Sequence, residues 1–165
     1  MKKSGYLFLL VALCMVLFGS GNVQAEEVKP FDLALWSPCQ IQTPKTSIEG
    51  LRISLFYGES KNVTGVDLSL IASTIKGNFK GYGNGLFKIV DGNASGWLDC
   101  GINIVKGDMV GLQTGLYNSA NKIHGVQLGL INMAEALKGV QIGLLNFNRT
   151  GKIYFFPIIN FSSSF

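Results

Sequence analysis

A short sequence motif, which starts with glycine and continues with alternating apolar and polar residues, occurs seven times between residue 50 and the C-terminus. The clearest copies are Gly111–Asn118, Gly125–Asn132 and Gly139–Asn146, which read GLQTGLYN, GVQLGLIN and GVQIGLLN. The repeat is 14–16 residues long, because its copies start near Gly50, Gly65, Gly81, Gly96 or Trp97, Gly111, Gly125 and Gly139. A unit this short holds one strand and a turn, or two very short strands, and is shorter than the units of helical solenoids.

The alternation within each unit predicts strands. Numbered from the glycine, positions 2, 4 and 6 carry residues such as Val126, Leu128 and Leu130, and these point to one face of a pleated strand. Positions 1, 3 and 5 face the other way, and position 5 is small in every copy: Ser54, Ser69, Gly85, Gly101, Gly115, Gly129 and Gly143. Because glycine weakens a strand unless something approaches it closely, we expect a crowded surface opposite the leucines. No helical periodicity competes, so the predicted class is all-β.

The sequence divides into three segments. Residues 1–25 are expected to be a secretory signal peptide, with Lys2 and Lys3, an apolar run over residues 6–18, and a small-residue cleavage site ending at Ala25. Residues 26–49 form a proline-containing lead-in with one short strand predicted at Phe31–Trp36. Residues 50–165 form a single β-repeat domain. The chain is therefore expected to be exported.

Charge and cysteine content narrow the classes of partner. The signal segment contains two of the 14 basic residues and none of the 10 acidic ones, which leaves a formal net charge of +2. This charge is too small to indicate a nucleic-acid partner. No stretch of 18 apolar residues follows the signal, so membrane insertion would have to use β-strands. Cys39 and Cys100 remain, and they form either a disulfide or two small buried thiols.

One way to fold the repeat is an antiparallel meander that closes into a small β-barrel of about eight strands. The strands would be the seven repeat strands and Lys152–Phe161. Positions 2, 4 and 6 would then face lipid, as in an outer-membrane protein, and the glycine and glutamine positions would face a narrow lumen.

The alternative is a β-solenoid, in which each unit is a complete coil. Positions 2, 4 and 6 would lie inside, together with Ile123, Ala134 and Leu137, and stacked asparagines at a corner near Asn118, Asn132 and Asn146 would form a ladder. Gln113, Gln127 and Gln141 would be presented outward as a flat ladder for glycans or another ordered surface. The residues leave both architectures open.

The units Gly125–Asn132 and Gly139–Asn146, with the ending Phe155–Phe161, resemble the leptospiral-type bacterial surface-repeat family. Its units read GLQLGLVN, and its members often close on a Phe-Pro-rich ending. The resemblance covers about residues 50–161 and is loose in the first four units, where Arg52, Asp67, Gly83 and Asp99 replace the glutamine. It implies a cell-surface or outer-membrane location in a bacterium, and no activity or site residues.

Residues with catalytic or metal-binding chemistry are sparse. His124 is expected to be solvated near a turn, and no nucleophile stands in a recognisable relation to it. Asp67, Asp91, Asp99 and Asp108 are scattered over different units, which favours turn and surface roles. We therefore predict no enzyme, no cofactor and no metal. The predicted function is a structural or adhesive surface or outer-membrane repeat protein; the alternative is a soluble exported solenoid that binds glycans or another ordered surface.

Overall fold

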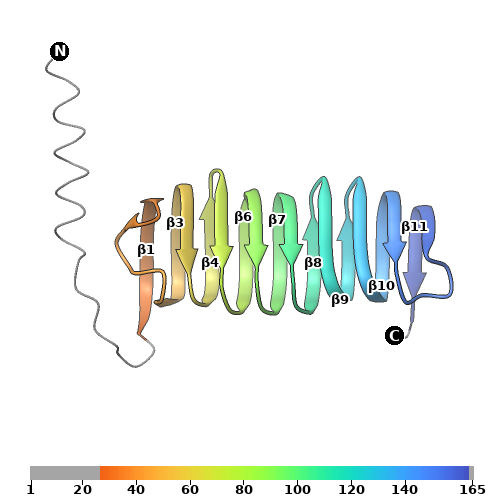
Figure 1. The fold of residues 1–165 in the computed structure, drawn as a ribbon, viewed down its shortest axis with the longest axis horizontal. Helices are drawn as coiled ribbons and strands as arrows, with labels where there is room; N and C mark the ends of the chain where they lie inside the picture. The colour runs from red at the N-terminus through yellow and green to blue at the C-terminus, as the bar shows by residue number, and fades with distance from the viewer. Residues whose placement is uncertain (1–26, 164–165) are drawn as a thin grey trace, which may run out of the picture.

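The computed structural model describes residues 27–163, so the predicted signal peptide lies outside the described residues. The chain forms a row of stacked coils with strands throughout (Figure 1). The strands are β1 (Val28–Trp36), β2 (Cys39–Gln40), β3 (Ser47–Ser60), β4 (Val63–Ser69), β5 (Ala72–Ile75), β6 (Phe79–Val90), β7 (Ala94–Val105), β8 (Met109–Thr114), β9 (Tyr117–Leu128), β10 (Ile131–Asn148) and β11 (Phe155–Ser162). The all-β class predicted from the sequence is confirmed.

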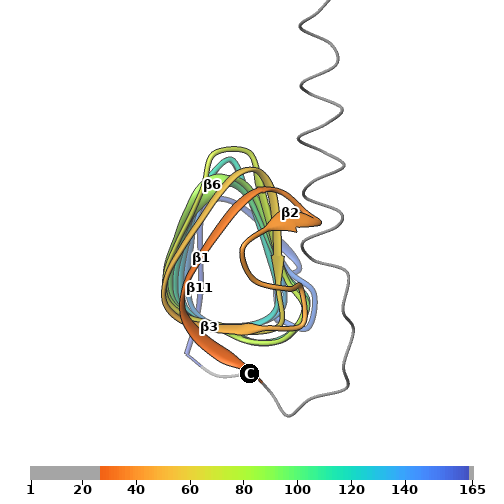
Figure 2. The same cartoon turned by 90° about the vertical axis from the view of Figure 1, so that its left-hand side faces the viewer.

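Successive units pair in parallel. Gly50 of β3 lies opposite Gly65 of β4, which lies opposite Gly81 of β6, and the register continues coil by coil to Gly139 of β10. Viewed along the stack, the coils superpose on one rounded, closed outline (Figure 2). The expected antiparallel barrel is therefore wrong, and the alternative β-solenoid is confirmed. The physical reason is that the chain bends at several corners within each unit, so it returns to its starting side after one unit and not after two (Figure 2).

The glycine at position 1 makes one of these corners. Gly125 has a φ of +150°, and a Cβ built on it would lie 1.9 Å from the carbonyl oxygen of Gly111 in the preceding coil. The seven stacked glycines all have φ between +120° and +150°, a range that residues with a side chain rarely adopt. The small fifth position is crowded too, as expected, because a Cβ on Gly143 would lie 2.0 Å from the Gly129 carbonyl oxygen. The fourth unit starts at Gly96, so its fifth residue is Cys100 and not Gly101.

The interior has a different composition from the one expected for a solenoid. Position 3 points inward, where Gln127 is fully buried, whereas Leu130 at position 6 is 49 % exposed. Positions 2, 4 and 6 thus face outward, as the barrel hypothesis had them, and the solenoid hypothesis was wrong about which face is inside. The apolar core comes from residues on either side of the lower turns: Ile48, Val63, Ile75, Phe79, Val90, Ala94, Leu98, Val105, Met109, Ala120, Ile123, Ala134 and Leu137.

The two ends of the stack carry strands that depart from the repeat. β1, which contains the short strand predicted at Phe31–Trp36, lies parallel to β3, and β2 folds back antiparallel onto β1. At the other end β11 runs antiparallel to β10. These strands cover the ends of the coil stack, as terminal repeats of solenoids do. Within the described residues no helix is long and apolar enough to cross a membrane.

Candidate functional site

The conspicuous glutamines of the repeat form a ladder inside the solenoid. Gln127 Nε2 donates to Gln113 Oε1 at 2.7 Å, and Gln141 Nε2 donates to Gln127 Oε1 at 2.8 Å. The ladder ends at β11, where Asn160 Nδ2 donates to Gln141 Oε1 at 3.0 Å. Since all three glutamines are fully buried, they cannot present a binding surface, and that part of the solenoid hypothesis is wrong. Their role is to satisfy one another's amides inside the solenoid.

A second internal ladder confirms the asparagine stack expected at a corner. The side-chain amides of Asn103, Asn118, Asn132 and Asn146 follow one another at 2.8–2.9 Å. Each also donates to backbone carbonyls near the corner, as Asn132 does to Ile142 O at 2.9 Å. The buried amides therefore bind the corner backbone as well as one another, which gives them a structural role.

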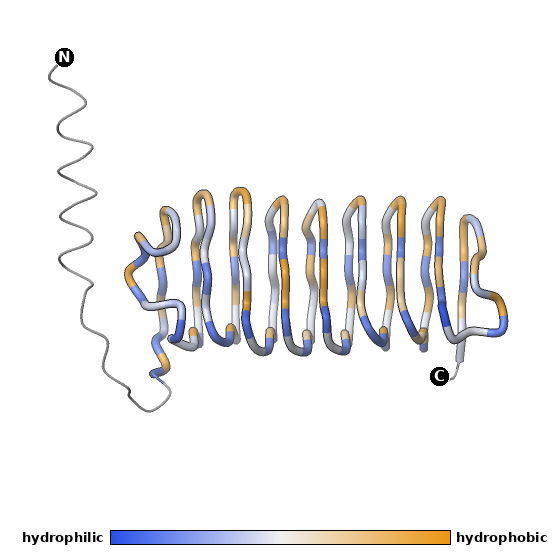
Figure 3. Tube along the Cα trace, viewed as in Figure 1, coloured by the Kyte–Doolittle hydropathy of each residue, from blue (hydrophilic) through white to orange (hydrophobic). Residues whose placement is uncertain are grey.

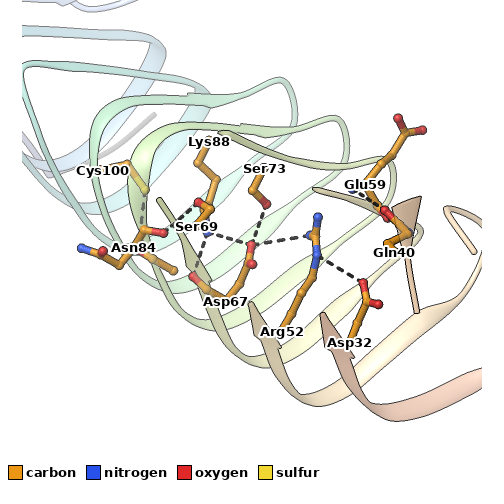
Figure 4. Close-up of polar contacts among 11 residues, drawn as sticks. Asp32, Gln40, Arg52, Glu59, Asp67, Ser69, Ser73, Asn84, Lys88 and Cys100 are labelled. Atoms are coloured by element: carbon orange, nitrogen blue, oxygen red, sulfur yellow. Dashed lines mark hydrogen bonds and ion pairs between the residues drawn. The ribbon is translucent and has the colours of Figure 1, made fainter. Parts of the chain in front are cut away.

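The first coils contain charged residues where the later coils have amides. Lys88 Nζ donates to Asp67 Oδ2 at 2.7 Å, and Arg52 Nη1 lies 3.6 Å from the same oxygen (Figure 4). Arg52 Nε lies 3.9 Å from Asp32 Oδ2, and all four side chains are fully buried. The expectation that Asp67 has a turn or surface role is therefore wrong. The sequence pattern does not reveal this network, because Arg52 and Asp67 stand in the column that later carries the glutamines and Lys88 stands in the column that later carries the asparagines.

The two buried carboxylates respond to their surroundings in opposite directions. Burial would raise the pKa of Asp67, but the neighbouring Lys88 and Arg52, with hydrogen bonds from Lys88 and Ser73, hold it below its ordinary value. Burial raises the pKa of Asp32, and its hydrogen bond from the Gln42 N–H at 2.9 Å and the more distant Arg52 only partly offset this. Asp67 is thus the firmly ionised member of the network.

The two cysteines of the described residues differ in burial. Cys39 and Cys100 are not joined by a disulfide, so that alternative is wrong. Of the two buried thiols expected instead, Cys100 is buried and Cys39 is half-buried. Burial raises the pKa of the Cys100 thiol to about 12, which keeps it protonated and unreactive at neutral pH. Among the described residues no group of three or more His, Cys, Asp or Glu side chains is arranged to hold a metal ion.

The other residues that the sequence offers for catalysis or metal binding lie apart from one another on the outer surface of the solenoid. His124 is exposed beside the corner glycine Gly125, as expected. Asp91 pairs with Lys106 at 2.7 Å, and Asp108 accepts a hydrogen bond from Asn121 at 3.0 Å, both at turns. Asp99 lies on an outward strand face. Of these residues, Asp99 lies next to a hydroxyl group, since its Oδ1 accepts a hydrogen bond from Thr114 Oγ1.

An apolar corner runs along the stack, with exposed or half-buried side chains in each coil from β3 to β10. We call it the apolar ridge. It consists of positions 6 and 7 of each coil, except that position 6 of the fourth coil is Gly101. Its residues are Leu55, Phe56, Leu70, Ile71, Leu86, Phe87, Ile102, Leu116, Tyr117, Leu130, Ile131, Leu144 and Leu145. Leu70, Leu116 and Leu144 are 68 %, 61 % and 63 % exposed. Large contiguous apolar surfaces are uncommon on proteins that meet only water, so the ridge is the candidate interaction surface of the described residues.

The opposite edge of the solenoid is polar. Its turns carry Lys76, Lys106 and Arg149. Each of them pairs with an acidic residue: Lys76 with Glu59 at 3.6 Å, Lys106 with Asp91 at 2.7 Å and Arg149 with Glu135 at 2.9 Å. Figure 3 shows the contrast, with hydrophobic residues along the upper turns and hydrophilic residues along the lower ones. The cross-section of the stack is therefore amphipathic.

Comparison of the chain with family models, with curated proteins and with solved structures finds no match.

Proposed function

We propose that this protein is an exported, non-enzymatic β-solenoid that attaches to a lipid surface through its apolar ridge. The observation that carries the proposal is the row of exposed leucines, among them Leu70, Leu116 and Leu144, at the same corner of successive coils. An amphipathic body with one apolar side lies in the membrane interface, with that side about 5–10 Å deep. The stack then serves a structural or adhesive role at the cell surface.

The shape of the ridge favours lipid over a second copy of the chain. A corner is convex in cross-section (Figure 2), so it can enter between lipid headgroups along its whole length. Two such corners placed against each other would bury little area, whereas a stable protein interface needs about 800 Å² per partner. The signal segment and the resemblance to bacterial surface-repeat proteins both support a location at the cell surface.

The test is co-sedimentation of the full chain with neutral phosphatidylcholine vesicles. The ridge variant carries Leu70→Ser, Leu116→Ser and Leu144→Ser, and we expect its vesicle partition coefficient to fall at least ten-fold, because about 1.5–3 kcal/mol of burial is lost per leucine. The matched control carries Lys76→Ser and Lys106→Ser on the polar edge and should bind like the wild type. Far-UV circular dichroism checks that both variants keep their strands.

Two results would overturn lipid attachment. One is wild-type protein that stays in the supernatant at every lipid concentration. The other is a dimer in sedimentation velocity that the ridge variant loses while vesicle binding is unchanged, because the ridge would then be an interface between copies.

A second candidate function is binding to an ordered solid such as a crystalline glycan. The observation in its favour is the parallel register, which places equivalent outward residues such as Leu112, Val126 and Val140 in straight columns. Neighbouring strands lie about 4.8 Å apart, so each column is a regular array. Retention on microcrystalline cellulose or chitin, undiminished in the ridge variant, would favour this function over lipid attachment.

A further inference from the structure

The outward face beside the ridge changes character in its middle coils. Positions 2 and 4 are aliphatic in the first and last coils, as in Val66 and Leu68 or Val140 and Ile142. In the third, fourth and fifth coils the parallel register instead places an aromatic and polar group together: Tyr82, Asn84, Trp97, Asp99 and Thr114. We call these five residues the central patch. A local departure from an otherwise regular repeat is where a specific contact can be built.

Two aromatic rings form one part of the central patch. Tyr82 and Trp97 are paired across neighbouring strands, with ring centroids 5.1 Å apart and ring planes inclined at 66°. Trp97 is 43 % exposed, so much of its indole remains open to a ligand. The faces of tyrosine and tryptophan rings carry a negative electrostatic potential and attract cations, and tryptophan attracts them most strongly.

A chain of hydrogen bonds holds the other part in place. Trp97 Nε1 donates to Thr114 Oγ1 at 3.0 Å, and the Thr114 hydroxyl in turn donates to Asp99 Oδ1. Asn84 Nδ2 donates to the Asp99 carbonyl oxygen at 3.0 Å. These bonds fix the indole and the carboxylate through the indole nitrogen and Oδ1, and leave the ring and Oδ2 for a ligand. Such a supporting network is what preorganises a binding site.

Charge determines the kind of ligand. Across positions 2, 4 and 6 of the seven units, Asp99 is the one charged side chain. Trp97 and Asp99 are two residues apart on one face of β7, which places them about 7 Å from each other along the strand. An aromatic ring and a carboxylate at this separation attract the same species, a cation with apolar substituents.

We propose that the central patch binds an organic ammonium group, which Asp99 pairs through Oδ2 while Trp97 and Tyr82 contact its carbon substituents. Two sources carry this chemistry, an amino sugar and the choline headgroup of a lipid. The site is distinct from the apolar ridge and does not depend on lipid attachment. Thr114 is a positioning residue, since it acts through the carboxylate and the indole.

Tryptophan fluorescence tests the proposal directly. The chain has two tryptophans, so Trp36→Phe leaves Trp97 as the single reporter. Titration of this full-length variant with choline chloride or glucosamine hydrochloride, at constant ionic strength, should give a saturable change with a Kd on the order of 1 mM. Glucose is the neutral control and should give at least ten-fold weaker binding. The tighter of the two ammonium probes identifies the source, and phosphatidylcholine vesicles added to the ridge variant test whether a lipid-borne headgroup is accepted.

Two variants in the Trp36→Phe background separate the roles. Asp99→Asn should weaken ammonium binding at least ten-fold, and Thr114→Val should weaken it less, because the charge remains while its position is lost. Asp91→Asn, on the polar edge, is the matched control and should bind as before. Equal affinity for glucose and glucosamine, unchanged binding by Asp99→Asn, or no saturable signal from a folded protein would each overturn the proposal.

Discussion

Lys88 and Asp67 form an ion pair of 2.7 Å inside the solenoid, where neither side chain is exposed to water. The pair joins two coils, since Asp67 comes from β4 and Lys88 from β6. Arg52 lies 3.6 Å from the same carboxylate, so Asp67 is the shared counterion of two buried cations. Removing it leaves Lys88 without its buried counterion and leaves Arg52 with only Asp32, 3.9 Å from its Nε, which is more costly than removing one of the cations.

Asp67→Asn is therefore expected to lower the free energy of unfolding by about 3–5 kcal/mol at pH 7, and Lys88→Met by less. Urea unfolding followed by circular dichroism measures both. Lys106→Met, which breaks the exposed pair with Asp91, is the control and should change stability by under about 1 kcal/mol. A smaller loss for Asp67→Asn than for Lys88→Met would contradict the shared-counterion arrangement.

The same network gives the stability a dependence on pH. The pKa of Asp67 is lowered on folding, so its contribution is complete above its unfolded pKa near 3.8 and is lost as pH falls through the folded value. The pKa of Asp32 is raised, so its contribution has the opposite sign and falls as pH rises above 3.8. We expect Asp32→Asn to be more stable relative to wild type at pH 7 than at pH 3. Urea midpoints measured at both pH values test this, and an equal difference at the two values would refute it.

The glutamine ladder allows a test of amide pairing. Gln127→Leu leaves Gln113 Oε1 and Gln141 Nε2 without their partners, so we expect a loss of about 1–3 kcal/mol. The combined replacement of Gln113, Gln127 and Gln141 by leucine leaves Asn160 Nδ2 as the one ladder amide that loses its side-chain partner, so it should cost less than three times the single change. Leu98 already occupies this column next to Gln113, which shows that the space accepts leucine. Strict additivity in thermal or urea unfolding would argue against the ladder.

The corner glycines should tolerate no side chain. Gly125→Ala places a Cβ 1.9 Å from the Gly111 carbonyl oxygen at a φ of +150°, and we expect a loss of about 2–4 kcal/mol. Gly101→Ala is the matched control, since its Cβ would meet its nearest atom at 3.0 Å and its φ is not positive. Thermal unfolding distinguishes the two, and equal midpoints would show that the corner is not sterically closed.

Much of the fold can be predicted from the sequence, because the same steric and hydrogen-bonding requirements recur at the same positions of every unit. The small fifth position correctly indicated crowding, and the recurring Asn118, Asn132 and Asn146 correctly indicated a ladder. The buried charges could not be predicted, because Arg52 and Asp67 take the place of glutamine within the same alternation. A sequence pattern does not distinguish a charged residue that faces water from a buried one whose counterion lies in the neighbouring coil.

The central patch was missed for a related reason. Trp97, Asp99 and Thr114 lie in different units or at alternate positions, and the fourth unit could be started at Gly96 or at Trp97. The parallel register of β7 and β8 pairs Gly96 with Gly111, so the fourth unit starts at Gly96, and it places Asp99 beside Thr114. The sequence predicts that Asp99 replaces the glutamine of the fourth unit, but Leu98 occupies that place in the structure.

The amino-acid sequence by itself determined the length of the unit, the strand alternation, the need for glycine at its start and the composition of the two faces. Only the tertiary structure decided that strands pair in parallel and that the glutamine face is the inside. The reason is that a period of two separates the faces of a strand without saying which one is buried. Buried glutamines become favourable only when the next coil supplies each amide with its partner, as Gln141 supplies Gln127. That partner exists only once the coils are stacked.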